Sequence, residues 1–154
     1  DLGRQLSSGA TGRYLRVAVV DERCEIGGTA AEGRRDLGVC TDLLSGCPKG
    51  EGILMALRSL SPDLILCDEV GKEEEIRAVS MALNSGVPVV ATIHASTLEE
   101  LLARPQGVAL LHTGAFQKVV LLEGAASPCK IKSIVEAGDF HAPVGRAFAD
   151  SSLL

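Results

Sequence analysis

Aromatic residues are scarce in this sequence, whose 154 residues include three phenylalanines, one tyrosine and no tryptophan. The core must therefore be aliphatic, and the shortage argues against a stacking platform for single-stranded nucleic acid. Positive charge is also in short supply, because 15 lysines and arginines stand against 20 acidic residues and give a net charge of -5. A chain with a pI near 5.2 is a poor match for the phosphate backbone of nucleic acids.

Long apolar runs and paired cysteines are absent as well. No run approaches the ~20 residues that are needed to span a bilayer. The five cysteines are odd in number and form no C-x-x-C pair, and some of them lie within apolar runs. These features favour reduced thiols in a cytoplasmic compartment over a disulfide framework. The residues concerned are Cys24, Cys40, Cys47, Cys67 and Cys129.

A phosphate-binding loop of the form G-x-x-x-x-G-K-[ST] does not occur in these residues. The segment 46–52, GCPKGEG, contains glycines and Lys49, but its spacing is wrong and no strand is predicted directly before it. Taken alone, the residues therefore indicate an acid-lined α/β site for which a nucleotide is one possible ligand.

The sequence does contain an alternation of apolar strands and amphipathic helices, with 46% hydrophobic residues overall. Short apolar, β-branched runs predict strands at residues 14–21, 63–69 and 87–95. Helical periodicity and capping signals predict helices at residues 52–60, 73–86 and 96–104. Two final strands, 118–124 and 129–138, are close enough in sequence to form an antiparallel hairpin. The alternation predicts an α/β domain with a largely parallel sheet.

One long segment, residues 22–51, shows many glycines and no clear periodicity. A structureless segment of this length inside a compact domain is usually functional or mobile. By contrast, the acidic run 73–75 is expected to be a solvated helix start, because negative charge is favourable in the first turn of a helix.

Polar side chains follow three of the predicted strands at their carboxyl ends, where open parallel sheets bind ligands. The first strand is followed by Asp21, Glu22 and Arg23, the second by Asp68 and Glu69, and the third by Thr92 and His94.

An apolar strand that ends in Asp-Glu suits the hydrolysis of a magnesium nucleotide. Magnesium prefers oxygen ligands and keeps several waters, so Asp68 can hold it through water. Glu69 can then orient, or accept a proton from, the water that attacks a γ-phosphate. The alternative is a non-enzymatic α/β interaction domain in which these acids only cap the following helices.

Several segments resemble the stage III sporulation protein AA family, a group of ATPases of endospore-forming bacteria related to the type II and type IV secretion ATPases. The resemblance runs from about residue 1 to about residue 137. It is carried by VVDERCEIGG, GVCTDLLSGCPKGEGILMALRSLSPDLILCDEVG and GVPVVATIHASTLEELLARP.

The resemblance implies a partial RecA-like P-loop NTPase core of the ASCE type, with a mostly parallel sheet, helices on both faces and a C-terminal β-hairpin. Residues 1–138 would form the C-terminal part of the ATPase domain and residues 139–154 a loosely ordered tail. The family places its Walker A loop just before a helix that resembles DLGRQLSSG. We therefore expect the phosphate loop to lie upstream of Asp1, which is not a methionine.

The resemblance also implies residue roles. Asp68 would be the Walker B magnesium acid and Glu69 the catalytic glutamate. Asp21, Glu22 and Arg23 resemble an acidic box near the γ-phosphate, and Thr92 or His94 would sense that phosphate. Arg58 matches an arginine that precedes the Walker B strand. Arg34 and Arg35 are candidates for arginine fingers that act across a subunit boundary, and Arg23, beside the same glycine-rich loop, is a third candidate. His112 and His141 have no matching context and are expected to be structural.

The implied cofactors are ATP and Mg²⁺. The implied partners are further copies of the chain in a ring, with a hexamer expected, and membrane proteins of a sporulation complex between mother cell and forespore. The resemblance implies no nucleic-acid partner. It implies a cytoplasmic location in the mother cell, peripheral to the inner face of the membrane.

Overall fold

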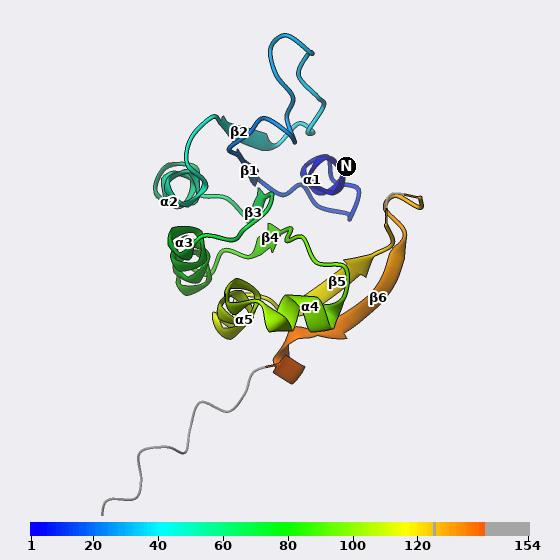
Figure 1. Ribbon diagram of the computed structural model, residues 1–154. Coiled ribbons are helices and arrows are strands. Elements are labelled where there is room, and N and C mark those ends of the chain that lie inside the picture. The colour runs from blue at the N-terminus through cyan, green and yellow to red at the C-terminus, as the bar shows by residue number, and fades with distance from the viewer. Residues whose placement is uncertain (125, 141–154) are drawn as a thin grey trace, which may run out of the picture.

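Four short parallel strands form the central sheet of this chain, seen in a computed structural model that describes residues 1–124 and 126–140 (Figure 1). The spatial order is β2-β1-β3-β4, so the first strand of the sequence lies inside the sheet. The strand bounds are β1 Val17–Asp21, β2 Thr41–Ser45, β3 Leu64–Cys67 and β4 Val89–Ala91. Because all pairs are parallel, every strand points its carboxyl end toward the same edge.

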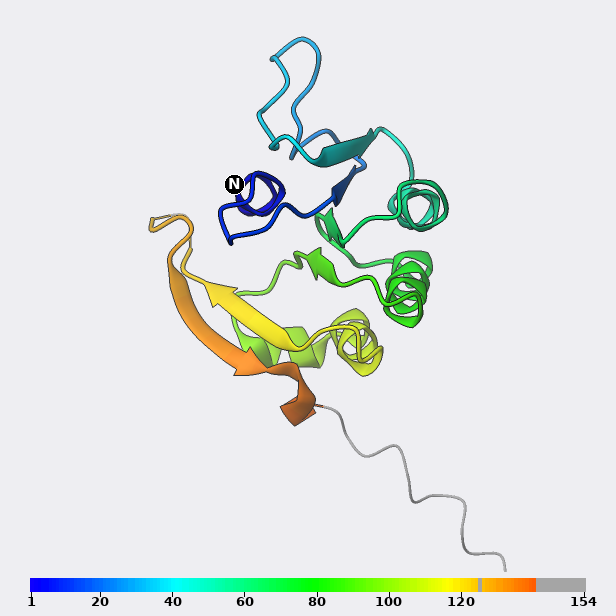
Figure 2. The same ribbon diagram turned by 180° about the vertical axis from the view of Figure 1, so that it is seen from behind.

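Helices cover both faces of this sheet. Figures 1 and 2 show α2, α3 and α5 stacked along one face and α1 on the opposite face. The helix bounds are α1 Leu2–Ser7, α2 Lys49–Ser59, α3 Glu73–Asn84, α4 Leu98–Ala103 and α5 Pro105–His112. The predicted α/β class with a mostly parallel sheet is therefore confirmed.

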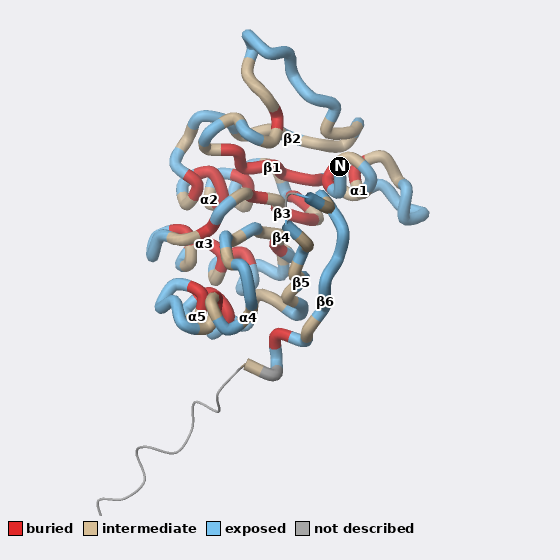
Figure 3. Tube along the Cα trace, turned by 45° about the vertical axis from the view of Figure 1, so that its right-hand side comes forward, coloured by how far each residue is buried: buried red, intermediate tan, exposed pale blue. Residues whose placement is uncertain are grey.

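Strand β1 is buried along its whole length (Figure 3). Its aliphatic side chains divide between the two faces of the sheet. Ala18 and Val20 pack with α2 and α3, whereas Val17 and Val19 pack on the face that α1 covers. This alternation follows from the two-residue period of a strand. A continuous VAVV run is what a strand buried on both faces requires.

The C-terminal strands form a separate antiparallel hairpin, β5 Lys118–Leu122 with β6 Ile131–Glu136, as the sequence predicts. It is followed by a short 3-10 helix, Ala137–Phe140. A small apolar cluster around Leu101 and Leu111 joins the hairpin region to α4 and α5.

Three predicted elements differ from the structure. The strand expected at 87–95 is only β4, because beyond Ala91 the Thr92 carbonyl and hydroxyl accept hydrogen bonds from residues that follow β3. The segment 22–51, in which no element was predicted, contains β2, and its last residues open α2. Pro105 ends α4 but also begins the unpredicted α5, where its missing N–H is not needed.

The predicted tail begins at residue 139, but Ala137–Phe140 is helical. Residues 141–154, including His141, lie outside the described part of the chain. Among the described residues, none of the helices has both the length and the apolar character to cross a membrane.

Candidate functional site

A small hollow lies at the carboxyl ends of β1 and β3, beside the first turns of α2 and α3. Its volume is about 140 Å³. Four carboxylates and three cationic side chains line it together with Gly71. The ionisable residues are Glu22, Arg23, Lys49, Asp68, Glu69, Lys72 and Glu75.

Lys49 lines this hollow and contacts several of its other residues. The spacing of the segment 46–52 does not fit a phosphate loop, so the sequence alone did not predict a role for Lys49. It begins α2 and is only 5% exposed. Its Nζ lies 2.9 Å from Asp68 Oδ1 and donates a hydrogen bond of 2.7 Å to the Glu69 carbonyl. Its backbone N–H donates to Glu22 Oε2 at 3.2 Å. Lys49 therefore links the residues that follow β1 and β3 to the start of α2.

The charges around Lys49 keep its side chain protonated. Burial alone would lower the pKa of Lys49, but the adjoining Asp68 carboxylate and the negative charge of Glu75 outweigh this and raise it. Glu22 behaves in the complementary way. Burial would raise the pKa of Glu22, but the Lys49 N–H and the Lys72 ammonium lower it below its ordinary value.

Asp68 is a largely buried carboxylate beside Lys49. Its side chain is 14% exposed, and its Oδ1 atom is buried with no aligned hydrogen-bond donor among the described residues, despite the nearby Lys49 ammonium. No cluster of three or more His, Cys, Asp or Glu side chains suited to a metal occurs in the described ranges. A single carboxylate still fits Mg²⁺, which binds through one or two carboxylates, waters and phosphate oxygens.

Glu69 is the accessible acid of the pair. Its side chain is 49% exposed and faces the Arg23 guanidinium at 3.9 Å, a solvated contact that contributes little to stability. Its backbone is held more firmly, because the Glu69 N–H donates to Thr92 Oγ1 at 3.0 Å and the Val70 N–H donates to the Thr92 carbonyl at 2.9 Å. Thr92 therefore positions the backbone of Glu69 and does not line the hollow.

The acidic run at the start of α3 is not uniformly solvated as predicted. Glu73 and Glu74 are exposed, but Glu75 is buried, and its Oε2 accepts hydrogen bonds from the backbone N–H groups of Gly71 and Lys72. The prediction for Glu75 was wrong because a glutamate at the third position of a helix can turn back and accept hydrogen bonds from the backbone that precedes the helix. Its place at that position was the local signal for this contact.

Asp21 is brought to the same sheet edge but does not line the hollow. Its carboxylate is fully buried and accepts hydrogen bonds from the backbone N–H groups of Glu25, Ile26 and Gly27, at 2.8, 3.1 and 2.8 Å. A carboxylate engaged in this way fixes the turn after β1. Its predicted direct role in catalysis stays a prediction, and the geometry gives it a structural task.

The other predicted site residues lie apart from the hollow. Arg58 is exposed in the last turn of α2, at the opposite end of that helix from Lys49. His94 is exposed, and its carbonyl accepts a hydrogen bond from Arg104 at 2.6 Å. Arg35 donates to the carbonyls of Glu25 and Ile26 within its own loop, and Arg34 is exposed. His112 closes α5 at the surface.

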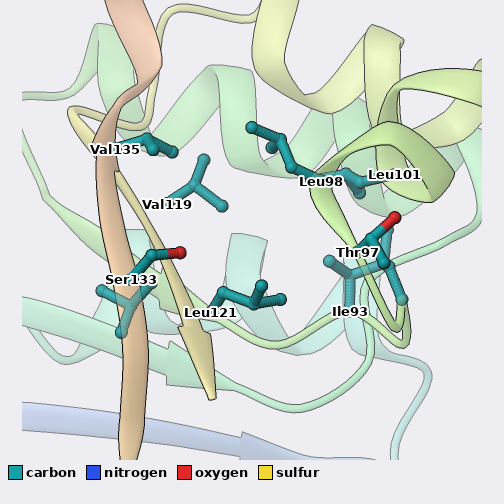
Figure 4. A pocket seen from close by; sticks show the side chains of 10 residues that line it. Ile93, Thr97, Leu98, Leu101, Val119, Leu121, Ser133 and Val135 are labelled. Carbon is teal, nitrogen blue, oxygen red and sulfur yellow. The ribbon is translucent and has the colours of Figure 1, made fainter. Parts of the chain in front are cut away.

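A second hollow, of about 60 Å³, lies between α4 and the hairpin (Figure 4). Figure 4 shows aliphatic side chains such as Leu98, Val119 and Val135 around it, with Thr97 and Ser133 as polar members. No ionisable side chain lines it. It lacks the groups that acid–base or phosphate chemistry requires.

The chain thus folds as an open parallel sheet with acids at its strand ends and helices on both faces. The X-ray structure of the ATPase DotB of Legionella pneumophila shares this fold, with a TM-score of 0.50 over 71% of this chain and 32% of DotB. The sequence identity of 19% makes this a likeness of fold alone. The chain itself belongs to the sporulation stage III, protein AA family, whose sequence profile matches residues 1–140.

One curated relative supports this placement, and a second is similar over a smaller part of its length. Stage III sporulation protein AA of Bacillus subtilis (strain 168) is 33% identical over 138 residues, which cover 88% of this chain and 45% of the relative. Protein SEEDLING PLASTID DEVELOPMENT 1 of Arabidopsis thaliana is 29% identical over 124 residues, covering 79% and 18%. The chain thus spans less than half the length of the curated relatives that it matches.

Proposed function

We propose that this chain carries the magnesium acid and the water-activating glutamate of an ATPase that acts in sporulation. The observation that carries the proposal is the pair Asp68 and Glu69 directly after β3, one acid sheltered beside a lysine and the other open to solvent. Family membership and the P-loop NTPase fold support it.

Asp68 and Glu69 would have different roles in the hydrolysis of ATP. Asp68 would hold Mg²⁺ through water, and the metal would supply positive charge to the phosphates. Glu69 lines the hollow with an accessible carboxylate, which would orient a water and take its proton. Thr92 accepts from the Glu69 N–H and Lys49 donates to the Glu69 carbonyl, so the backbone of Glu69 is held beside Asp68.

At the scale of the assembly, we propose a ring of identical subunits that acts on membrane proteins of a sporulation complex, from the cytoplasmic side of the mother-cell membrane. The phosphate contacts that the described residues do not offer would come from a Walker A loop elsewhere in the full-length protein. His94 is retained in this proposal as a sensor of the γ-phosphate, which would require its exposed segment to move toward the hollow.

The test is Glu69→Gln in the full-length protein. We expect ATP hydrolysis to fall by about 100-fold or more, because the base is lost while the shape is kept. Affinity for Mg-ATP, measured by calorimetry, should stay close to that of the wild type. Glu74→Gln makes the same chemical change at an exposed position of α3 and should hydrolyse ATP at the wild-type rate. If Glu69→Gln hydrolysed ATP at close to the wild-type rate, the catalytic assignment of Glu69 would be wrong. The alternative would then be a non-enzymatic interaction domain in which these acids cap the following helices.

A further inference from the structure

Lys49 is a buried lysine in a place where the proposed function expects a divalent cation to bind. Its ammonium lies 2.9 Å from Asp68 Oδ1, and only 6% of the Lys49 side chain is exposed. A buried ion pair of this kind is costly to form, so it is weak evidence for a role in stability.

The contacts of Lys49 divide into two kinds. The hydrogen bond to the Glu69 carbonyl is directed, at 2.7 Å, and ties Lys49 to the backbone. The contact with Asp68 is close but not aligned, and it leaves Asp68 Oδ1 without a hydrogen-bond donor. Lys49 therefore neutralises the charge of the Asp68 carboxylate. A divalent cation that binds this carboxylate would have to displace the ammonium from Oδ1.

We propose that Lys49 is the internal counter-cation of Asp68, a positioning residue that competes with a divalent metal for this carboxylate. The inference rests on the proposed function, in which Asp68 is the magnesium acid. In the absence of metal, Lys49 holds Asp68 at the end of β3 and keeps its charge balanced. When metal binds at Asp68, the ammonium gives up this contact and keeps its hydrogen bond to the Glu69 carbonyl.

The charges that line the hollow indicate how the affinity of Asp68 for a metal changes when Lys49 is replaced. Four carboxylates face three cations in the hollow, and Lys49 is the cation that lies beside Asp68. Lys72 is 65% exposed and lies 3.5 and 3.7 Å from Glu22 and Glu75, so solvent screens its charge. Lys49 and Lys72 are therefore a matched pair for substitution, because both line the hollow and only Lys49 contacts the Asp68 carboxylate.

The test measures Mn²⁺ binding to the nucleotide-free full-length protein by electron paramagnetic resonance. Lys49→Gln should bind Mn²⁺ on the order of tenfold more tightly than the wild type, because a unit positive charge next to the site is removed. Lys72→Gln, which removes a screened charge from the same hollow, should change the affinity much less. The double variant Lys49→Gln with Asp68→Asn should lose the gain.

Four results would overturn the inference: unchanged or weaker Mn²⁺ binding by Lys49→Gln, an equal gain from Lys72→Gln, a gain that persists without the Asp68 carboxylate, or no binding by any variant.

If Lys49→Gln is too unstable to purify, its melting temperature in crude soluble extract is followed instead. It should rise with MgCl₂ more than that of the wild type, since a ligand stabilises the state that binds it, and an equal rise would count against competition. Because no nucleotide is present, this result is independent of whether Glu69→Gln loses ATP hydrolysis.

Discussion

Cys67 closes β3 immediately before the two acids, at a position where a strand usually carries valine or isoleucine. Its side chain is 1% exposed and belongs to the core cluster between the sheet and α2 and α3. Burial raises the pKa of this thiol to about 12, although the Lys49 charge acts in the opposite direction. Cys67 is thus a small apolar residue of the core and not a nucleophile of the neighbouring site.

This protection gives a prediction that thiol labelling can check. In the native protein at pH 8, iodoacetamide should modify the exposed Cys129 and leave Cys67 unmodified, and both should react in denaturant.

The pKa of Cys67 also predicts how stability depends on pH. The folded-state pKa of Cys67 lies above the ordinary value of 9.0, so the protonated thiol is favoured by folding. The stability is therefore present below about pH 9 and decreases as pH rises toward 12. Cys67→Val should show a smaller loss of unfolding free energy over that window; an equal loss would contradict the assignment.

Asp21 shows how a resemblance and a geometry can assign different tasks to one residue. By resemblance it belongs to an acidic box near the γ-phosphate, whereas its three backbone hydrogen bonds make it the cap of the turn 25–27. Of the three residues in that box, Glu22 and Arg23 line the hollow. The residues closest to the chemistry are therefore the two that follow Asp21.

At the scale of elements, α2 approaches β1 closely at Gly52, three residues after Lys49. An added Cβ at Gly52 would lie 2.6 Å from Val20 Cγ1 and 3.1 Å from Cys47 Sγ. Only glycine fits at this distance, and the close approach brings Lys49, at the start of the same helix, against Asp68.

Gly52→Ala should therefore destabilise the protein even though alanine is the better helix former. The gain of about 1 kcal/mol in helix propensity is smaller than the overpacking cost, which reaches about 1–3 kcal/mol. Chemical denaturation of the full-length protein should show the net loss. Ser59→Ala, at an exposed position of the same helix, should stay within about 0.5 kcal/mol of the wild type. A Gly52→Ala protein more stable than the wild type would show that α2 can move away from β1.

The elements that sequence reasoning found are those whose signal is local. The runs around β1 and β3 are continuous and apolar, and α3 carries its own capping pattern, so each could be placed without knowing its neighbours. Strand β2 was missed because Thr41–Ser45 has only two apolar residues and lies among glycines. Its strand conformation depends on pairing with β1, which is a contact distant in sequence.

The same distinction applies to the site. Asp68 and Glu69 were predicted because they follow a recognisable strand. Lys49 was not, because its importance lies in burial against segments that are remote in sequence. Glu75 was misassigned although its position in the first turn of α3 is a local signal for capping. A lysine that follows proline at the start of a helix gives no local sign that it will be buried.

At the scale of the whole molecule, the proposed ring requires a residue that reaches a neighbouring subunit. The structure separates the three candidate arginines. Arg23 faces Glu69 of its own chain, and Arg35 is hydrogen-bonded within its loop. Arg34 is exposed in the loop between β1 and β2. We therefore prefer Arg34 as the residue that would act in trans.

Mixing two inactive full-length variants tests this preference. Arg34→Ala with Glu69→Gln should recover part of the ATPase rate, because some interfaces then pair an intact Glu69 with an intact Arg34. A guanidinium supplied in this way is worth about 10³-fold or more in rate. The mixture of Arg23→Ala with Glu69→Gln should give no recovery. Arg23 faces Glu69 of its own chain, so every subunit in the mixture lacks one of the two residues. If the first mixture stays inactive after native mass spectrometry shows mixed oligomers, Arg34 does not act in trans.

The inner position of β1 also bears on how the protein is made. Strand β1 is synthesised before both of its neighbours in the sheet, β2 and β3, the second of which ends only at Cys67. At ~5–20 residues per second, the ribosome needs a few seconds after β1 to produce that second neighbour. During this interval the apolar VAVV run lacks its partner β3. It is therefore a segment of the nascent chain that a ribosome-associated chaperone would be expected to bind.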